Sequence, residues 1–157
     1  MEAAFLPDDF RDLLIELVDG QVDFVMVGGY AVAFHGHPRA TKDLDVLIRV
    51  APANAQRAFR ALARFGAPLV AMGVTPLDLL TAGRVLQLGY PPVRIDVLNE
   101  ATGITFDEAI AAGDCFELEG RSIPVIGRAA LVKNKLATGR DQDRVDAQVL
   151  TKQRENA

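Results

Sequence analysis

The sequence predicts an α/β fold, built as a single domain over residues 1–157. An apolar, β-branched run at 24–27 is followed at once by Gly28 and Gly29 and then by a helix-compatible segment, which is the order of a strand, a tight turn and a helix. Several other segments carry apolar residues at helical spacing, and two pairs of short strand-like runs are separated by turn residues. A hydrophobic content of 50% with 24% charged residues is ordinary for a globular protein with a real core.

The first half of the chain is expected to hold two long helices around a unit of strand, turn, helix and strand. The long helices have apolar residues at helical spacing, and prolines and glycines stand where their first and last turns would be. In order, the expected elements are a helix over 10–18 that follows Pro7 and Asp8 and is stopped by Gly20, a strand at 24–27, a helix at 30–34, a strand at 43–48 and a helix at 52–65. The following segment, 68–83, predicts a short strand at 70–72 and one or two helical turns at 76–81.

The second half of the chain is expected to form two antiparallel strand pairs and three helices. The turn residues Gly89 to Pro92 separate the first pair, and Glu119 and Gly120 separate the second. In order, the expected elements are strands at 84–88 and 93–98, a helix at 105–112, strands at 115–118 and 122–125, and helices at 128–138 and 141–153. Gly139 breaks the last two helices apart, and Asp141 suits the N-cap of the second.

Asp43 and Asp45 open the strand at 43–48 and form the first candidate site. Side chains at positions i and i+2 of a strand share a face, so the two carboxylates should point the same way, roughly 6 to 7 Å apart. Two acids on an otherwise apolar strand are costly unless a cation or hydrogen bonds compensate them. The alternative interpretation is a strand cap beside a solvated residue, because Asp is common in turns.

Asp96 is a third candidate acid, in a strand-like run where it shares a face with Arg94. If the sheet brings this run beside Asp45, three carboxylates meet at one place. Carboxylates from neighbouring strands are ligands that Mg²⁺ or Mn²⁺ accepts, with water and substrate phosphates completing the shell. The pattern therefore indicates catalytic and metal-binding roles for Asp43, Asp45 and Asp96 in phosphoryl or nucleotidyl transfer. The alternative is that Asp96 pairs with Arg94 or Arg84.

The glycine turn and the loop before the aspartates are candidate nucleotide-binding segments. A backbone that turns at Gly28 and Gly29 into a helix N-terminus offers unpaired N–H groups to a phosphate, although a glycine pair is also common in structural turns. In the loop, Arg39 could grip a phosphate and Thr41 could hydrogen-bond the ligand or the loop itself. The alternative for these two is a solvent-facing arginine and a local hydroxyl turn.

Composition disfavours several other classes of protein. The net charge of −4, with two tyrosines and no tryptophan, argues against binding of long duplex DNA and against a plain nucleic-acid-binding protein. The single cysteine, Cys115, cannot form an internal disulfide, and no Cys and His spacing resembles a zinc site. The N-terminus is unlike a signal peptide and no apolar run approaches roughly 20 residues, so we expect no membrane association and a cytoplasmic location.

The glycine pair at 28–29, the Asp-x-Asp motif at 43–45 and the later Asp96 resemble the signature of the nucleotidyltransferase fold superfamily, the DNA polymerase β-like group. More narrowly, residues 27–48 and 133–150 are similar to small prokaryotic nucleotidyltransferase-like proteins, including those related to AbiEii-type toxins. The resemblance implies an α/β (α+β) fold with a mixed, mostly antiparallel sheet, flanking helices and a C-terminal helical pair.

The resemblance also implies a function and a set of site residues. It implies a Mg²⁺-dependent nucleotidyltransferase that moves a nucleoside monophosphate from a nucleoside triphosphate such as ATP to a hydroxyl of a protein, an RNA end or a small molecule. The three aspartates would hold the metal, the glycine pair would lie near the triphosphate, and Lys135 could reach the triphosphate oxygens. The alternative for Lys135 and its charged neighbours is ion pairing on exposed helix faces, such as Arg140 with Asp143 or Lys133 with Asp146.

A second hypothesis is a catalytically idle module of the same fold that binds a nucleotide or a partner protein, as one component of a toxin–antitoxin-like pair. The short chain leaves little room for a separate acceptor-binding domain, which favours this hypothesis. The complete set of three acids argues against it, because a structural role gives no reason to keep three desolvated carboxylates.

Overall fold

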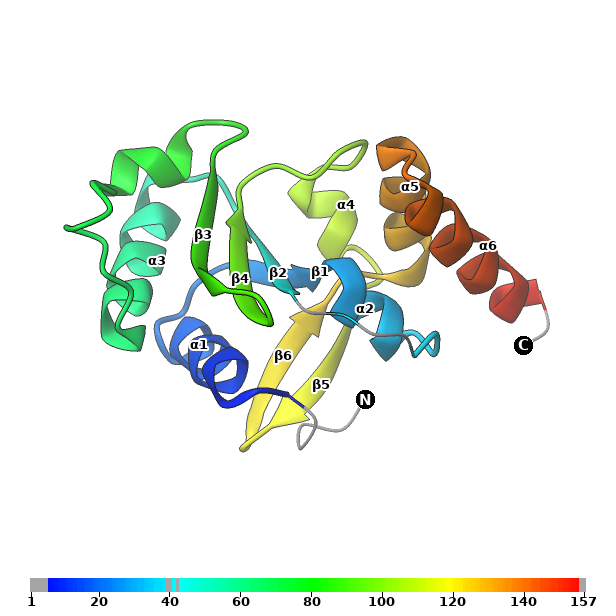
Figure 1. Cartoon of the computed structure of the whole chain (residues 1–157), viewed down its shortest axis with the longest axis horizontal. Helices are drawn as coiled ribbons and strands as arrows, with labels where there is room; N and C mark the ends of the chain where they lie inside the picture. Colours follow the sequence, from blue (N-terminus) through cyan, green and yellow to red (C-terminus); the bar gives the residue numbers. More distant parts are fainter. Residues whose placement is uncertain (1–5, 39–40, 42, 156–157) are drawn as a thin grey trace.

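The computed structural model describes residues 6–38, 41 and 43–155, and within them a six-stranded mixed sheet forms the centre of the molecule (Figure 1). The strand order across the sheet is β3-β4-β2-β1-β6-β5. The strands are β1 (Phe24–Val27), β2 (Asp43–Ile48), β3 (Val85–Tyr90), β4 (Val93–Leu98), β5 (Asp114–Leu118) and β6 (Arg121–Val125). Three pairings, β1 with β2, β3 with β4 and β5 with β6, are antiparallel, and the other two are parallel. The mixed, mostly antiparallel sheet expected from the sequence is therefore confirmed.

The register of the central strands brings the acidic positions together. Strand β2 pairs in parallel with β4, with Asp45 opposite Asp96 and Asp43 opposite Arg94. On its other side β2 pairs with β1, with Asp45 opposite Val27, the last residue before the glycine pair. Two strands far apart in sequence thus present their polar residues at the same end of the sheet.

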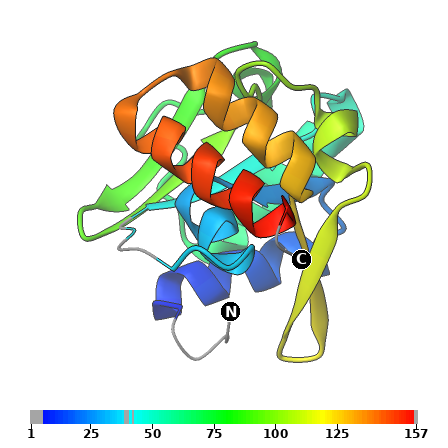
Figure 2. The ribbon, with the colours of Figure 1, turned by 90° about the vertical axis from the view of Figure 1, so that its right-hand side faces the viewer.

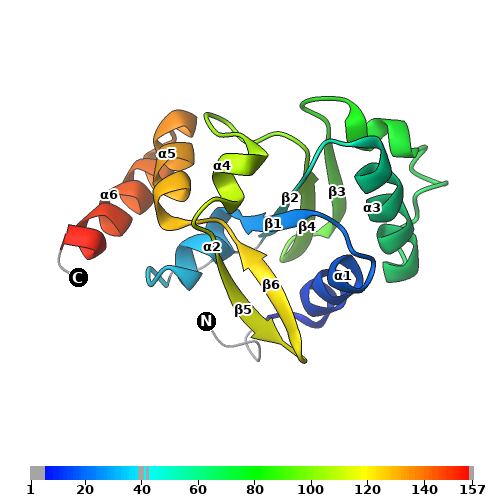
Figure 3. The same cartoon turned by 180° about the vertical axis from the view of Figure 1, so that it is seen from behind.

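The helices lie at the two sides of this sheet. They are α1 (Asp8–Asp19), α2 (Gly28–Phe34), α3 (Pro52–Phe65), the 3₁₀ helix η2 (Pro76–Leu80), α4 (Phe106–Ile110), α5 (Arg128–Thr138) and α6 (Asp141–Glu155). Helices α1 and α3 contact each other on one side of the molecule, and α5 and α6 form a pair on the other (Figures 1 and 3). Seen from that other side, the α5 and α6 pair lies across α2, with which α5 is in contact (Figure 2).

The core is one cluster of apolar side chains shared by the sheet and its helices. Helix α1 contributes its periodic residues, which are fully buried, and every residue of β1 is buried, which explains the unbroken apolar run in the sequence. No helix within the part of the chain that the structure describes is long and apolar enough to cross a bilayer.

Most of the expected elements are present with small shifts at their ends. Helices α3 and α5 have the expected bounds, whereas α2 already begins at Gly28. The strand expected at 70–72 is wrong: these residues lie in turns, closed by backbone hydrogen bonds such as Met72 N to Pro68 O. Asp141 is the first residue of α6 rather than its N-cap, a difference of one position at a helix end.

Candidate active site

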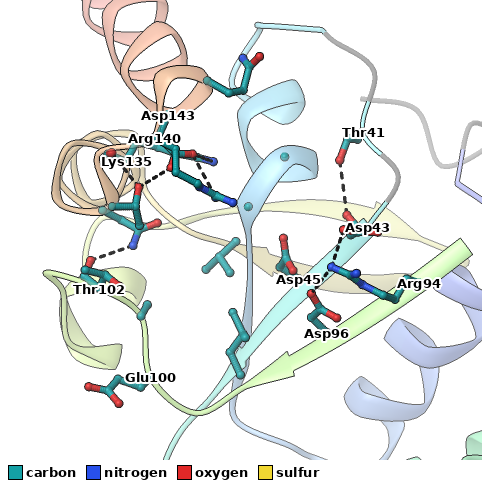
Figure 4. A pocket seen from close by; sticks show the side chains of 18 residues that line it. Thr41, Asp43, Asp45, Arg94, Asp96, Glu100, Thr102, Lys135, Arg140 and Asp143 are labelled. Atoms are coloured by element: carbon teal, nitrogen blue, oxygen red, sulfur yellow. Dashed lines mark hydrogen bonds and ion pairs between the residues drawn. The ribbon is translucent and has the colours of Figure 1, made fainter. Parts of the chain in front are cut away.

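A cavity of about 610 Å³ lies at the end of the sheet where β1, β2 and β4 face the α5 and α6 pair (Figure 4). Acidic side chains of β2 and β4 form one wall, which also holds Arg94. The basic side chains Lys135 and Arg140 at the α5 to α6 junction form the other wall, which also holds Asp143. The lining includes Gly28, Thr41, Asp45, Asp96, Lys135 and Arg140. The sheet register and the helix pair therefore bring most of the sequence-derived candidates into one cavity.

Gly28 and Asp45 fit against each other at the floor of this cavity. Gly28 has a φ of +70°, a left-handed conformation that residues with a side chain rarely adopt. A Cβ at this position would overlap the Asp45 carboxylate and would lie 2.9 Å from its Cγ. The glycine is thus needed for the backbone turn and for the acid beside it, whereas the sequence suggested only a turn for a phosphate.

Arg94 connects the other two acids of the site. Its Nη2 donates a hydrogen bond to Asp43 Oδ2 at 2.8 Å and a second to Asp96 Oδ2 at 3.1 Å (Figure 4). Sequence reasoning anticipated the pair with Asp96 as an alternative, but it did not anticipate the pair with Asp43, because that contact depends on the β2 to β4 register. The other candidate partner, Arg84, pairs instead with Asp78.

Asp45 carries the strongest electrostatic perturbation of the acidic wall. Burial, together with repulsion from Asp96 and Asp43, raises the pKa of Asp45 to about 7. A hydrogen bond between the Asp45 and Asp96 carboxyls adds to this rise, and the positive charge of Lys135 opposes it. Near neutral pH the protonated and ionised forms of Asp45 are therefore both populated, and an added cation would favour the ionised form.

The three carboxylates fit a magnesium ion in their chemistry. All three acids offer hard oxygen ligands, and Asp96 Oδ1 is buried and accepts no hydrogen bond from a described donor while Asp45 is ionised. The side chains as they stand do not enclose an ion: within residues 6–38, 41 and 43–155, no three carboxylate, imidazole or thiol groups gather closely enough to do so. Arg94 holds two of the three acids at this point.

The basic wall is a buried network at the junction of α5 and α6. Lys135, whose side chain is only 6% exposed, lies 3.2 Å from Asp143 Oδ1 and 3.5 Å from Asp146 Oδ2. Arg140 Nε and Thr138 Oγ1 each donate to Asp143 Oδ2 at 2.7 Å. The network is buried, so it is not the exposed ion pairing that the sequence offered as an alternative, although the pair of Arg140 with Asp143 is confirmed.

Of the two cations in this network, Arg140 is exposed at the cavity and Lys135 is buried. Burial works to raise the pKa of Asp143, but hydrogen bonds from Arg140, Thr138 and Lys135 outweigh it and hold that pKa well below its usual range. The Arg140 side chain is 77% exposed and lines the cavity. The expected pair of Lys133 with Asp146 is wrong, because Lys133 points to Glu108 at 2.6 Å and Asp146 faces Lys135.

The loop before β2 contributes Thr41 to the cavity. Thr41 lines the cavity, and its hydroxyl lies 3.5 Å from the backbone oxygen of Asp43, the long limit of a hydrogen bond. Arg39, the predicted phosphate ligand of this loop, lies outside the described residues. At the far rim, Asn134 donates to the backbone oxygen of Thr102 at 2.8 Å, a contact between α5 and a loop that no local sequence signal reveals.

Comparison with solved structures identifies the class of fold. The chain has a nucleotidyltransferase-like fold. An inferred nucleotidyltransferase of Thermotoga maritima superposes with a TM-score of 0.59 at 15% identity, over 94% of this chain and 91% of that one. The antibiotic-resistance factor ANT(2'')-Ia superposes with a TM-score of 0.58 at 12% identity, over 92% and 82% of the two chains. The lincosamide antibiotic adenylyltransferase LnuA, solved with lincomycin bound, gives 0.54 at 14% identity, over 93% and 96%.

At these identities the likeness concerns the fold. No protein-family model matches the chain, and no curated protein matches it in sequence. The similarity to AbiEii-type toxin-related proteins stays a prediction from the sequence.

Proposed function

We propose that this chain is a nucleotidyltransferase that moves a nucleoside monophosphate from a nucleoside triphosphate to a hydroxyl acceptor, with Mg²⁺ or Mn²⁺ as its cofactor. One observation carries the proposal: three carboxylates on adjacent strands face a cavity whose opposite wall carries an exposed arginine (Figure 4). A bound triphosphate is stabilised by positively charged groups along its length. Carboxylates repel it unless a metal ion lies between them and the phosphates. A cavity with three carboxylates on one wall and the exposed guanidinium of Arg140 on the other meets both needs.

The donor triphosphate would lie between Gly28 and Arg140. The guanidinium of Arg140 is exposed at the cavity and can donate to phosphate oxygens. Lys135 is buried between two acids, so we assign it a contribution through its charge rather than the direct contact that the sequence suggested. Gly29 and Thr41 line the same space and would contact the phosphates or the sugar.

Asp43, Asp45 and Asp96 would hold the metal, which supplies charge neutralisation on the triphosphate and a lower pKa for the acceptor hydroxyl. In the reaction, the acceptor oxygen forms a bond to the α-phosphorus, and the bond from the α-phosphorus to the bridging oxygen of the leaving group breaks. The hydroxyl proton passes to Asp96, whose buried Oδ1 has no other described donor, and pyrophosphate leaves.

For the acceptor we propose a small molecule with a free hydroxyl ahead of a protein side chain or an RNA end. Support comes from two neighbours in fold, one an adenylyltransferase of lincosamide antibiotics and the other an antibiotic-resistance factor. The net charge of −4 gives no general attraction to a polyanionic acceptor.

A second candidate function is a catalytically idle module that binds a nucleotide or a partner protein. The ion pairs of Arg94 favour it, because a guanidinium that permanently neutralises Asp43 and Asp96 would leave no room for a metal. Asp96 Oδ1 argues against it, because Arg94 contacts only the other oxygen and leaves this buried one without a described donor while Asp45 is ionised.

One labelling experiment distinguishes the two candidate functions. The purified chain is incubated with each α-labelled nucleoside triphosphate and Mg²⁺ or Mn²⁺, together with a panel of hydroxyl compounds, RNA and the chain itself. Transfer of label with release of pyrophosphate is expected for the wild type and for the control Asp114→Asn, which alters an exposed acid on the outer strand β5. The Asp45→Asn and Asp96→Asn variants should lose the transfer by at least about a hundredfold. Nucleotide binding without transfer under every condition would favour the idle module.

A further inference from the structure

Arg94 stands where a cation would be expected among the three acids. Its position opposite Asp43 in the parallel β2 to β4 pairing, two residues before Asp96 on the same strand, lets one guanidinium nitrogen reach both carboxylates. The side chain is about a third exposed, at 30%, and lines the same cavity as the acids. Its Nε is buried and makes no hydrogen bond to any described group. Nη2 of the guanidinium is therefore hydrogen-bonded to two carboxylates, whereas Nε has no described acceptor.

This placement affects how a metal can enter. Asp43 and Asp96 each use one carboxylate oxygen on Arg94, and no three acids stand together as a ligand cluster within the described residues. A divalent cation that arrives alone competes with Arg94 for both carboxylates, and ligation through the oxygens that Arg94 holds would leave the guanidinium without an acceptor. A metal that arrives with a triphosphate brings its own oxygens, which a guanidinium binds as well as it binds carboxylates.

We propose that Arg94 is a positioning residue that makes metal binding depend on the nucleotide. It holds Asp43 and Asp96 while the triphosphate is absent, and it moves its hydrogen bonds to triphosphate oxygens when metal and nucleotide enter together. This inference rests on the proposed nucleotidyl transfer and adds to it an order of events: the carboxylates become available to the metal only when a phosphate is there to take Arg94. By linkage, the metal must strengthen nucleotide binding by the same factor as the nucleotide strengthens metal binding.

The test measures Mn²⁺ binding by the electron paramagnetic resonance signal of free Mn²⁺, with no turnover required. The full-length chain is titrated with Mn²⁺ alone and with each of the α,β-methylene analogues of the nucleoside triphosphates, after subtraction of Mn²⁺ binding by the analogue. For the wild type, one analogue should tighten Mn²⁺ binding by at least about tenfold. In Arg94→Gln, Mn²⁺ alone should bind about tenfold more tightly than to the wild type, and the effect of the analogue should fall below about threefold.

Two further variants keep the result specific. Arg84→Gln removes a positive charge of the neighbouring strand region, where Arg84 pairs with Asp78, and should leave the coupling at its wild-type value. Arg94→Lys keeps the positive charge but lacks the planar guanidinium, so it should give an intermediate coupling between Mn²⁺ and the analogue. If Arg94→Gln does not fold, Arg94→Lys provides the test in its place.

The possible failures are distinguishable. If the wild type binds Mn²⁺ and analogue cooperatively but Arg94→Gln, or Arg94→Lys in its place, leaves the coupling unchanged, the role of Arg94 is overturned and the proposed function stands. Equal shifts in Arg94→Gln and Arg84→Gln would also overturn it, because they would reflect net charge alone. If the wild type binds neither Mn²⁺ nor any analogue, the proposed function itself fails.

Discussion

The carboxylate of Asp45 lies against Gly28, in the space that a side chain at position 28 would occupy. The first residue of the glycine pair and the second residue of the Asp-x-Asp motif are therefore one structural unit. Their contact follows from the antiparallel register of β1 and β2, which sets Val27 opposite Asp45. The Asp45 carboxylate fits against the turn only because residue 28 has no Cβ.

The first prediction concerns this contact. Gly28→Ala should destabilise the fold and abolish binding of metal and nucleotide, because the new Cβ meets the Asp45 carboxylate in addition to the strain of a positive φ. The matched control is Gly120→Ala, where φ is +76° but no atom stands within 4 Å, so only the backbone strain of about 1 kcal/mol applies. Urea unfolding of both variants measures the difference. Equal losses of unfolding free energy would show that the contact with Asp45 is unimportant.

The second prediction concerns pH. The folded-state pKa of Asp45 is raised to about 7, above the value of 3.8 for a free side chain, so the native chain binds this proton more tightly than the unfolded chain does. The contribution of this group to stability is complete at low pH and is lost as pH rises through about 7. Asp45→Asn should therefore be more stable than the wild type above pH 7 and should lose this advantage progressively as pH falls from about 7 toward 4. Urea unfolding at several pH values checks this, with Asp114→Asn as the control for loss of an acid outside the site.

The third prediction concerns the buried network of α5 and α6. Asp143→Asn removes a carboxylate that is 1% exposed and hydrogen-bonded to Arg140, Thr138 and Lys135. Leaving a buried cation partly uncompensated should cost about 3 kcal/mol of unfolding free energy. Because the pKa of Asp143 is lowered in the folded chain, the stabilisation by its carboxylate is present above the pKa that Asp143 has in the unfolded chain. It is lost in strong acid.

The control for the network is the neighbouring acid Asp141. Its side chain is fully exposed and pairs with Arg144 at 3.6 Å, so Asp141→Asn should change the unfolding free energy by less than about 1 kcal/mol. Comparable losses in the two variants would contradict a special role for the buried network.

The fourth prediction concerns Arg140, the exposed arginine of the basic wall. Arg140→Gln should weaken binding of a nucleoside triphosphate by about tenfold, since a charge-assisted hydrogen bond to phosphate is lost. Arg144→Gln changes an arginine of α6 that is also exposed but does not line the cavity, and it should leave nucleotide affinity unchanged. Isothermal titration with the triphosphate analogue measures both. An unchanged affinity in Arg140→Gln would move the phosphate contact to another residue.

The elements that sequence reasoning recovered are those with a local signal. The strand at 24–27 is buried along its whole length, and helix α3 begins at a proline and ends at Gly66 in the left-handed conformation. The short strand expected at 70–72 failed because a hydrophobic pair there, with Val70 92% exposed, belongs to a turn on the surface. Hydrophobic residues in a short segment do not by themselves distinguish a strand from an exposed loop.

The parts of the site that sequence reasoning missed depend on contacts between distant segments. Arg94 and Asp43 are 51 positions apart and meet only through the β2 to β4 register. The burial of Lys135 depends on how α6 turns back along α5, which no periodicity in either helix specifies. That the three acids would come together was predicted from motif and order, and all three line one cavity, whereas the contact of Arg94 with Asp43 required the sheet register.

The buried network between α5 and α6 also constrains how this protein can diverge. Lys135 is enclosed by Asp143 and Asp146, so a lineage that replaces the lysine by an apolar residue inherits two acids facing each other in the interior. Such a replacement should persist only where one of the acids has also been replaced. Among relatives of this chain, these positions should therefore change together, while the exposed charges of α6 vary independently of one another.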